Sequence, residues 1–411
     1  MHLPHKLTAI LSSAQQRRAY FWLPLLMGLM GGFILALTLV VMEQLSLLIW
    51  EHHYQQHPLV IFGIFAVGGI LIGLLQQKLA QLKQTTEGTK GDPLRLGLVI
   101  LIGIFAVGLG ASIGPEAALM AIGAEMAWII RHYLYTSQHE AAYIERLGQE
   151  ATFGEFYTVP VVTKETGLNL PPSTMADTEP TIPWFARILT FACVAVAFYF
   201  SLKLLNPEGS LHRIHLVAVE QSFNLWAPLV AALSAGLLTL VFVRLGRTLM
   251  QDMQKLQLSY LPLYKGILSG VLIGFVCALH PFLRGAGYYE LEYLQAHEIG
   301  LWVLLLIAVL KLMLILLSVT GGWLGGVIFP LFFVGGALGA ATVQIIPGNV
   351  DAAMLAAMTS AIYISLRKPI LLLILILLLV ENLQIPALLV GLGVGMLLER
   401  LLMAHLEMQG H

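Results

Sequence analysis

The chain has 411 residues, of which 58% are hydrophobic and 11% charged, and its formal net charge is −1. Soluble domains carry about 25% charged residues, so this composition excludes a protein that faces water on all sides. The charge balance gives no indication of a nucleic-acid partner. The two cysteines, Cys193 and Cys277, lie in apolar runs without disulfide or metal-site spacing, and we expect no metal and no cofactor.

Apolar runs of the length that crosses a bilayer, roughly 17–25 residues, recur along the whole chain. The first follows Lys6, Arg17 and Arg18 and is too long for a signal peptide, so we expect it to be a transmembrane helix. The runs lie at 20–42, 58–75, 96–112, 116–132, 186–205, 226–246, 262–280, 300–319, 327–343, 351–366, 369–380 and 386–404. The predicted fold class is an all-α, polytopic membrane protein.

The loops between these runs differ in their content of basic residues. Residues 1–19 carry three Lys or Arg, the loop 43–57 carries none, and the loop 76–95 carries four. Because short cytoplasmic loops are enriched in Lys and Arg, we expect the N-terminus to lie in the cytoplasm.

Two polar stretches interrupt the apolar pattern. The segment 133–184 is polar and proline-rich, and the segment 206–224 lies near the middle of the chain. We therefore predict a first membrane half at 1–205, a connecting segment at 206–224 and a second membrane half at 225–411.

A glycine-proline break occurs once in each predicted half. The sequence GASIGPEAALMAIGA at 110–124 can be placed under GWLGGVIFPLFFVGG at 322–336 with a constant offset of 212 residues, which matches three glycines. Paired broken segments in two halves are the best sequence indication of a transporter's binding site. The first segment also holds a carboxylate, Glu116, in an otherwise apolar run, where an acid is costly and marks a pathway or a site.

A helix that begins inside the membrane leaves its first N–H groups without partners, so these groups must line a cavity or meet a ligand. Together with the helix dipole they form an anion site that needs no basic side chain. The residues expected to bind an anion are Gly114, Glu116, Ala117, Val327, Ile328 and Phe329. Glu116 could occupy the anion position itself as a gate that protonation releases; the alternative is a structural acid bonded to a neighbouring helix end.

Other polar groups have plainer interpretations. Glu125 is expected to be structural, and the histidines of EHHYQQH at 51–57 are expected to form a solvated patch rather than a metal pair. Arg367 and Lys368 are expected to cap a helix at the cytoplasmic surface, and Phe329 could line the pore or pack in the core.

These elements resemble the CLC family of chloride channels and proton-coupled chloride transporters. Gly114-Pro115-Glu116-Ala117-Ala118 is similar to the family's gating element, Gly326-Val327-Ile328-Phe329-Pro330 is similar to its second element, and 361–386 resembles a later segment of the family that includes Glu381. The resemblance implies an inverted-repeat bundle with broken, partly re-entrant helices, and a homodimer in a bacterial inner membrane. It implies transport of chloride or a similar small anion, as a channel or an H⁺/Cl⁻ exchanger.

The chain departs from the family pattern at three places. Pro115 stands where the family has arginine, no Gly-Ser-Gly-Ile-Pro element occurs near residues 70–80, and the last ten residues contain no tyrosine. The family's inward-facing proton glutamate has no clear match, and Glu165 is one candidate for it. The alternatives are a CLC fold that moves another anion such as fluoride, a membrane-embedded enzyme that uses Glu116 as general acid or base, and a membrane protein that transports nothing.

Overall fold

The computed structural model describes residues 22–50, 57–85, 92–127, 129, 184–206, 214–216, 224–255, 260–287, 290–291, 293–294 and 299–409. Glu165, nearly all of the polar segment 133–184, and the histidines at 52 and 53 lie outside this part of the chain.

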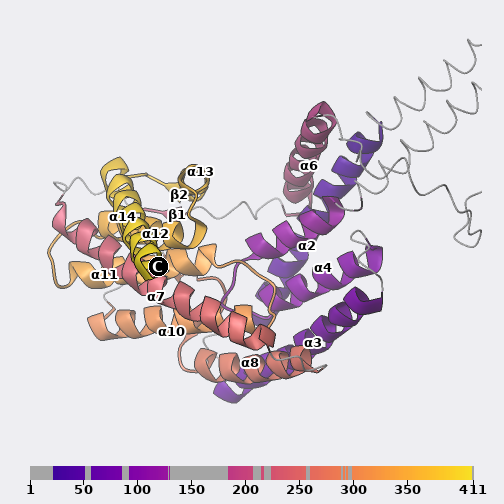
Figure 1. Ribbon diagram of the computed structural model, residues 1–411, viewed down its shortest axis with the longest axis horizontal. Coiled ribbons are helices and arrows are strands. Elements are labelled where there is room, and N and C mark those ends of the chain that lie inside the picture. The colour runs from indigo at the N-terminus through magenta and orange to yellow at the C-terminus, as the bar shows by residue number, and fades with distance from the viewer. Residues whose placement is uncertain are drawn as a thin grey trace, which may run out of the picture. The chain divides into compact units, whose positions relative to one another are not determined.

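Helices follow the predicted apolar runs closely, and most boundaries agree within three residues (Figure 1). The helices are α2 (Leu23–Trp50), α3 (Pro58–Thr85), α4 (Pro93–Gly108), α6 (Trp184–Leu205), α7 (Trp226–Lys255), α8 (Leu261–Cys277), η4 (Pro281–Leu283), α10 (Leu301–Thr320), α11 (Ile328–Val343), α12 (Val350–Leu366), α13 (Pro369–Leu379) and α14 (Ile385–Gln409). A further helix without a label runs over residues 115–127. The prediction of an all-α chain is confirmed for the described residues, apart from two strands of two residues each.

Four helices run well past their predicted ends: α2 and α3, and also α7, which continues to Lys255, and α14, which continues to Gln409. α2 continues through residues 43–50 and α3 continues through residues 76–85, both of which the sequence assigned to loops. The first extension contains neither glycine nor proline, and the second consists largely of Gln, Lys, Leu and Ala, which are good helix formers. Lys78 and Lys83 therefore belong to the last turns of α3 and not to a loop.

Five of the described helices are long and apolar enough to cross a membrane. They are the helical segments Leu25–Trp50, Pro58–Leu82, Ile188–Leu205, Trp226–Asp252 and Leu301–Thr320. Several other apolar helices, including α4, α8, α11, α12 and α13, have 10–17 residues. Such short helices suit a fold whose helices are broken within the bilayer.

The chain divides into two compact units. One comprises residues 1–37, 89–96 and 123–207, and the other comprises residues 38–88, 97–122 and 208–411. In the first unit, α6 packs closely on the beginning of α2 at Gly28, where an added Cβ would lie 2.7 Å from the Cβ of Cys193. Small residues that bring backbones together are the usual means of packing helices in membranes.

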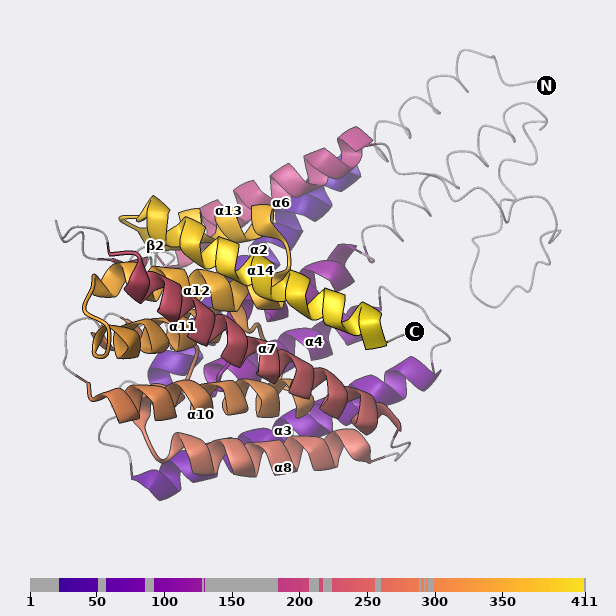
Figure 2. The same cartoon turned by 60° about the vertical axis from the view of Figure 1, so that its left-hand side comes forward.

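The second unit contains two helices that are buried nearly all round. α11 and α12 pack on each other, and α12 also packs on α7 and α14 (Figure 2). Of the 17 residues of α12, 14 are buried. A helix that is buried on every side belongs in the interior, so α11 and α12 form part of the core of this unit.

α3 and α8 form the closest helix pair in the second unit (Figure 1). Gly69 and Gly73 of α3 face Gly266 and Gly270 of α8, and a Cβ at Gly270 would lie 2.6 Å from the Cα of Gly69. Both helices therefore carry a Gly-x-x-x-Gly pair at the contact, a spacing that lets two backbones touch.

A short parallel bridge joins β1 (Ile214–His215) to β2 (Val380–Glu381) within the second unit. The His215 Nδ1 lies 2.8 Å from the Glu381 carboxylate. Glu381, predicted from the resemblance to be structural, thus holds the segment between the predicted halves against the segment that follows α13.

Candidate functional site

Two turns of the second unit have matching backbone geometry. α4 ends at Gly108 and is followed by Gly110 at φ 77°, whereas α10 ends at Thr320 and is followed by Gly322 at φ 83°. Both glycines adopt the left-handed conformation that other residues avoid, which is a common way to end a helix. The two breaks therefore use the same device at positions 212 residues apart.

The turns meet at a second pair of glycines with the same separation. The Gly114 N–H donates to the Gly326 carbonyl at 2.8 Å, and the Gly326 N–H donates to the Gly114 carbonyl at 2.7 Å, in an antiparallel bridge. The correspondence predicted from the sequence offset is thereby confirmed as a physical contact. Antiparallel pairing of two similar segments is the geometry of an inverted repeat.

The carboxylate of Glu116 lies against this bridge. Its Oε1 accepts a hydrogen bond of 2.8 Å from the backbone N–H of Ile328, the first residue of α11. A Cβ added at Gly114 or at Gly326 would overlap the Glu116 carboxylate, so both positions require glycine while the side chain lies there. The carboxylate therefore occupies the N-terminus of α11, where unpaired N–H groups and the helix dipole favour an anion.

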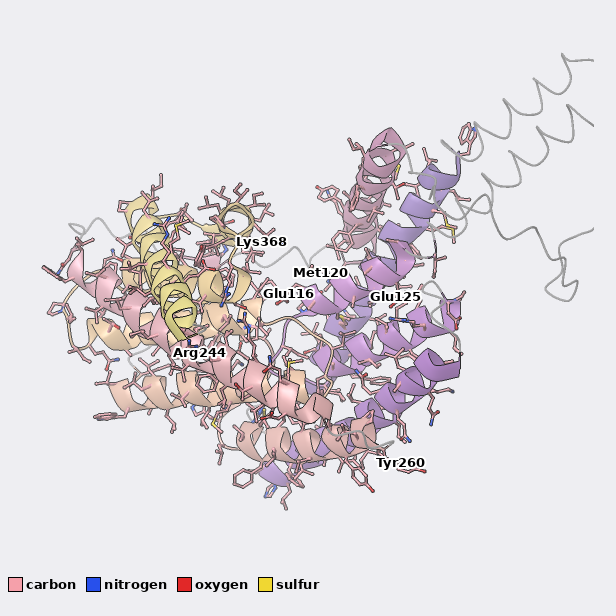
Figure 3. All side chains as sticks on the ribbon, viewed as in Figure 1. Glu116, Met120, Glu125, Arg244, Tyr260 and Lys368 are labelled. Carbon is pink, nitrogen blue, oxygen red and sulfur yellow. The ribbon has the colours of Figure 1, made fainter. Side chains whose placement is uncertain are left out.

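The second oxygen of this carboxylate has fewer hydrogen-bond partners. Oε2 is buried and has no hydrogen-bond partner among the described residues. The backbone N–H groups of Phe329 and of Glu116 itself also act on the carboxylate, but Glu116 has no ion-pair partner in the described chain. Figure 3 shows Glu116 at the start of the helix that also carries Met120 and Glu125. An acid held by backbone groups alone is free to be displaced without breaking a salt bridge.

The structure brings together most of the residues predicted to bind an anion. Phe329 packs on Gly114, with its ring 2.8 Å from a Cβ placed there. Glu116, Ala117, Val327, Ile328 and Phe329 are all partly exposed, whereas the flanking Gly114, Gly326, Ala118 and Pro330 are buried. Five of the six predicted residues are thus partly exposed, and the sixth, Gly114, belongs to the buried frame beside them.

Three further residues support the turns and were not predicted. The Gln76 side chain donates to the Gly322 carbonyl at 2.6 Å. Trp50 packs against Gly110, and Trp323 lies in the second turn and donates to the Ser269 hydroxyl at 2.9 Å. Gln76 lies in the stretch that lacks the family's serine motif. Its polar side chain directly after an apolar run is the sequence feature that could have indicated a role in the site.

Residues with plainer predicted roles have clear partners. Glu125 lies 2.8 Å from Arg95 within the first unit, which supports its structural interpretation. Arg367 is the left-handed C-cap of α12 and pairs with Glu399 at 3.6 Å, while Tyr363 donates to the same carboxylate at 2.7 Å. Lys368 occupies the N-cap position of α13 without a capping side-chain hydrogen bond. The two residues thus lie at helix ends as predicted, and their place at the cytoplasmic surface stays a prediction.

The sequence model described as voltage gated chloride channel matches residues 68–400. The chain belongs to this family of chloride channels. Members of the family are ion transporters or channels and not enzymes, so the chain is an integral, multi-pass membrane protein of ion transport.

The chain is also similar to individual members of the chloride channel family. YfeO of Escherichia coli O1:K1, which is named provisionally as an ion-transport protein, is 25% identical over 330 residues, 76% of each chain. A CLC-type fluoride/proton antiporter superposes with a TM-score of 0.62 at 18% identity, covering 92% of this chain and 94% of that one. A slow cyanobacterial Cl⁻/H⁺ antiporter gives 0.61 at 16% identity, covering 96% and 99%. These superpositions establish the CLC fold.

Proposed function

We propose that this protein moves small inorganic anions, chloride first, through a CLC-type pathway gated by Glu116. The observation that carries the proposal is the hydrogen bond of 2.8 Å from the Ile328 N–H to the Glu116 carboxylate. A carboxylate that binds a helix N-terminus occupies the position that a permeating anion would bind. Ionised, Glu116 competes with the anion; protonated, it loses its attraction to the N-terminus and leaves the position open.

The proposed anion ligands are backbone N–H groups from both elements, at Glu116 and Ala117 on one side and at Val327, Ile328 and Phe329 on the other. The Gly114 N–H, also predicted as a ligand, is used by the Gly326 carbonyl, so Gly114 only frames the position. Backbone N–H groups attract an anion more weakly than a lysine or an arginine would, so the ion can also leave. Conduction needs binding that is favourable on entry and weak enough for release.

The location and assembly belong to the same proposal. We propose a homodimer in a bacterial inner membrane with the N-terminus in the cytoplasm, divided into halves at 1–205 and 225–411 around the segment 206–224. Glu165 stays a candidate for inner proton transfer and lies outside the described residues.

The test is ion flux in liposomes that contain the purified protein. We expect chloride efflux without Na⁺ or K⁺ flux, increasing as the pH falls. The same assay with fluoride in place of chloride shows whether the protein is selective for fluoride. If a pH gradient drives chloride against its own concentration gradient, the protein is an exchanger. Cation flux without anion flux would contradict the proposal.

Glu116→Gln tests the gate, because the substitution keeps the size of the side chain and removes its charge. We expect flux that depends only weakly on pH and the loss of any proton coupling. Glu125→Gln is the matched control. It changes the same residue type on the same helix, but at a carboxylate that pairs with Arg95 and not with the N-terminus of α11. The control should keep the wild-type pH profile; a Glu116→Gln profile that also stays unchanged would refute the gate.

A further inference from the structure

Lys311 is a buried cation in the middle of a transmembrane helix. It belongs to α10 (Leu301–Thr320), a candidate membrane span, and its relative exposure is 0%. Burying an ammonium group is expensive unless it is fully compensated, and ionisable residues within the membrane are functional candidates by default. In the sequence, Lys311 lies inside the predicted apolar run 300–319.

All three donors of the Lys311 ammonium are used by one short segment. Nζ donates to the carbonyls of Phe282 at 3.1 Å, Arg284 at 3.1 Å and Gly285 at 2.8 Å. It also lies 5.1 Å from the centre of the Phe333 ring, in cation–π range. Because an ammonium group has three donors and no acceptor, Lys311 has none left for a permeating anion and instead acts on the segment 282–285.

That segment is bonded in turn to the glutamate-bearing element. The Gly285 N–H donates to the Gly110 carbonyl at 2.7 Å. Arg284 lies 5.5 Å from the centre of the Trp50 ring, which packs against Gly110. The turn that begins at Gly110 leads within six residues to Glu116, so the segment supports the base of the proposed gate by two independent contacts.

The same ammonium group touches the partner helix of the gate. Phe333 lies on α11 one turn after Phe329, and the N-terminus of α11 holds the Glu116 carboxylate. Lys311 therefore contacts α11 directly and the glutamate-bearing element only through the segment 282–285. The ionisable groups around it are Arg284, Cys277 and Glu290; none in the described chain makes an ion pair with Glu116 or with Lys311.

We propose that Lys311 is a positioning residue for the Glu116 gate. By holding three carbonyls of the segment 282–285, it fixes the Gly110 turn so that the carboxylate meets the N-terminus of α11. The inference rests on the proposed function of Glu116, and it adds a residue outside the two anion-binding elements.

The test compares Lys311→Met, which keeps the length of the side chain and removes charge and donors, with the wild type. We expect the midpoint of the pH dependence of chloride flux to move to higher pH, because a carboxylate that meets the N-terminus of α11 less well is ionised less readily. A shift of about one pH unit corresponds to a tenfold change in the protonated fraction of Glu116. In a Glu116→Gln background, Lys311→Met should change the residual pH profile no further. A merely structural lysine would lower the yield and leave the midpoint in place.

Lys311→Arg is the matched control, since it keeps the buried charge. We expect its midpoint to stay near that of the wild type, and a shift as large as that of Lys311→Met would count against the positioning role. If the Met variant does not fold, Lys311→Gln replaces it. Hydrogen exchange of the 109–116 backbone gives a second readout, and it should rise in Lys311→Gln and not in Lys311→Arg; equal exchange in both overturns the positioning role.

The two proposals fail in distinguishable ways. A wild-type protein without pH-dependent flux, or a Glu116→Gln variant that retains it, refutes the gate. The role of Lys311 alone is refuted if the wild type and Glu116→Gln behave as expected but the midpoint of Lys311→Met or Lys311→Gln does not move.

Discussion

At the level of single residues, the two bridging glycines are the most constrained positions of the site. Gly114 and Gly326 each leave a volume that the Glu116 carboxylate fills. Neither has the positive φ of Gly110 or Gly322, so alanine is compatible with the backbone at both. The requirement for glycine comes from the side chain that lies between them.

We predict that Gly326→Ala displaces the Glu116 side chain from the N-terminus of α11. The added Cβ overlaps the carboxylate, so chloride flux at neutral pH should rise and the ratio of acid to neutral flux should fall severalfold. Flux against pH in liposomes measures this ratio. Gly123→Ala is the control, because a Cβ there meets nothing within 4 Å; a Gly326→Ala profile that matches this control would contradict the prediction.

Sequence reasoning identified Glu116 but not the residues that hold its surroundings. Glu116 could be found because a carboxylate after Gly114-Pro115 breaks an apolar run. Lys311 also breaks an apolar run, but its role depends on carbonyls 26–29 residues away. No spacing rule relates a lysine inside one helix to the backbone of a preceding loop, so only the structure could assign it.

At the level of elements, the contact between α3 and α8 depends on the absence of side chains. The helices are antiparallel neighbours in which Gly69 and Gly270 approach through their Cα atoms. This packing also places Gln76 of α3 next to Gly322 and Ser269 of α8 next to Trp323. α3 and α8 therefore support the turn at Gly322 and Trp323 through these two side chains.

We predict that Gly270→Ala destabilises the protein. A Cβ at this position would lie 2.5 Å from the Phe65 carbonyl oxygen and 2.6 Å from the Cα of Gly69, and overpacking of this kind costs about 1–3 kcal/mol. Thermal unfolding in detergent should show a lower midpoint. Gly63→Ala on α3 should not lower it, because a Cβ there meets nothing within 4 Å and alanine favours helix; equal midpoints for the two variants would disprove the packing argument.

The helix boundaries were largely predictable because apolar length reports directly on membrane helices. Where the prediction was wrong, at the ends of α2, α3, α7 and α14, a helix continued into a sequence that contains no glycine or proline. Hydropathy marks where the apolar part of a segment stops, whereas the helix stops where its hydrogen bonding stops.

At the level of the whole molecule, the family relationship implies assembly as a homodimer, which stays a prediction for this chain. α13 exposes a broad apolar face that includes Ile370, Leu377 and Leu378. In a membrane such a face meets lipid or another helix, so exposure alone does not decide between them.

We predict a dimer in mild detergent, with a mass about twice that of the 45.0 kDa chain. Mass photometry or light scattering coupled to chromatography measures it, and cross-linking in native membranes provides the control for detergent effects. A monomer that carries out normal anion flux in liposomes would remove the dimer and leave the proposed gate in place.

The sequence by itself determined the membrane class, the approximate helices, the two broken elements and their offset of 212 residues. These features follow from composition, hydropathy and glycine-proline punctuation, which are local properties of the chain. The tertiary structure decided that Gly114 pairs with Gly326, that the Glu116 carboxylate accepts from the Ile328 N–H, and that Lys311 holds the segment 282–285. Those contacts join residues between 26 and 212 positions apart, and their geometry depends on how broken helices pack, which no local pattern encodes.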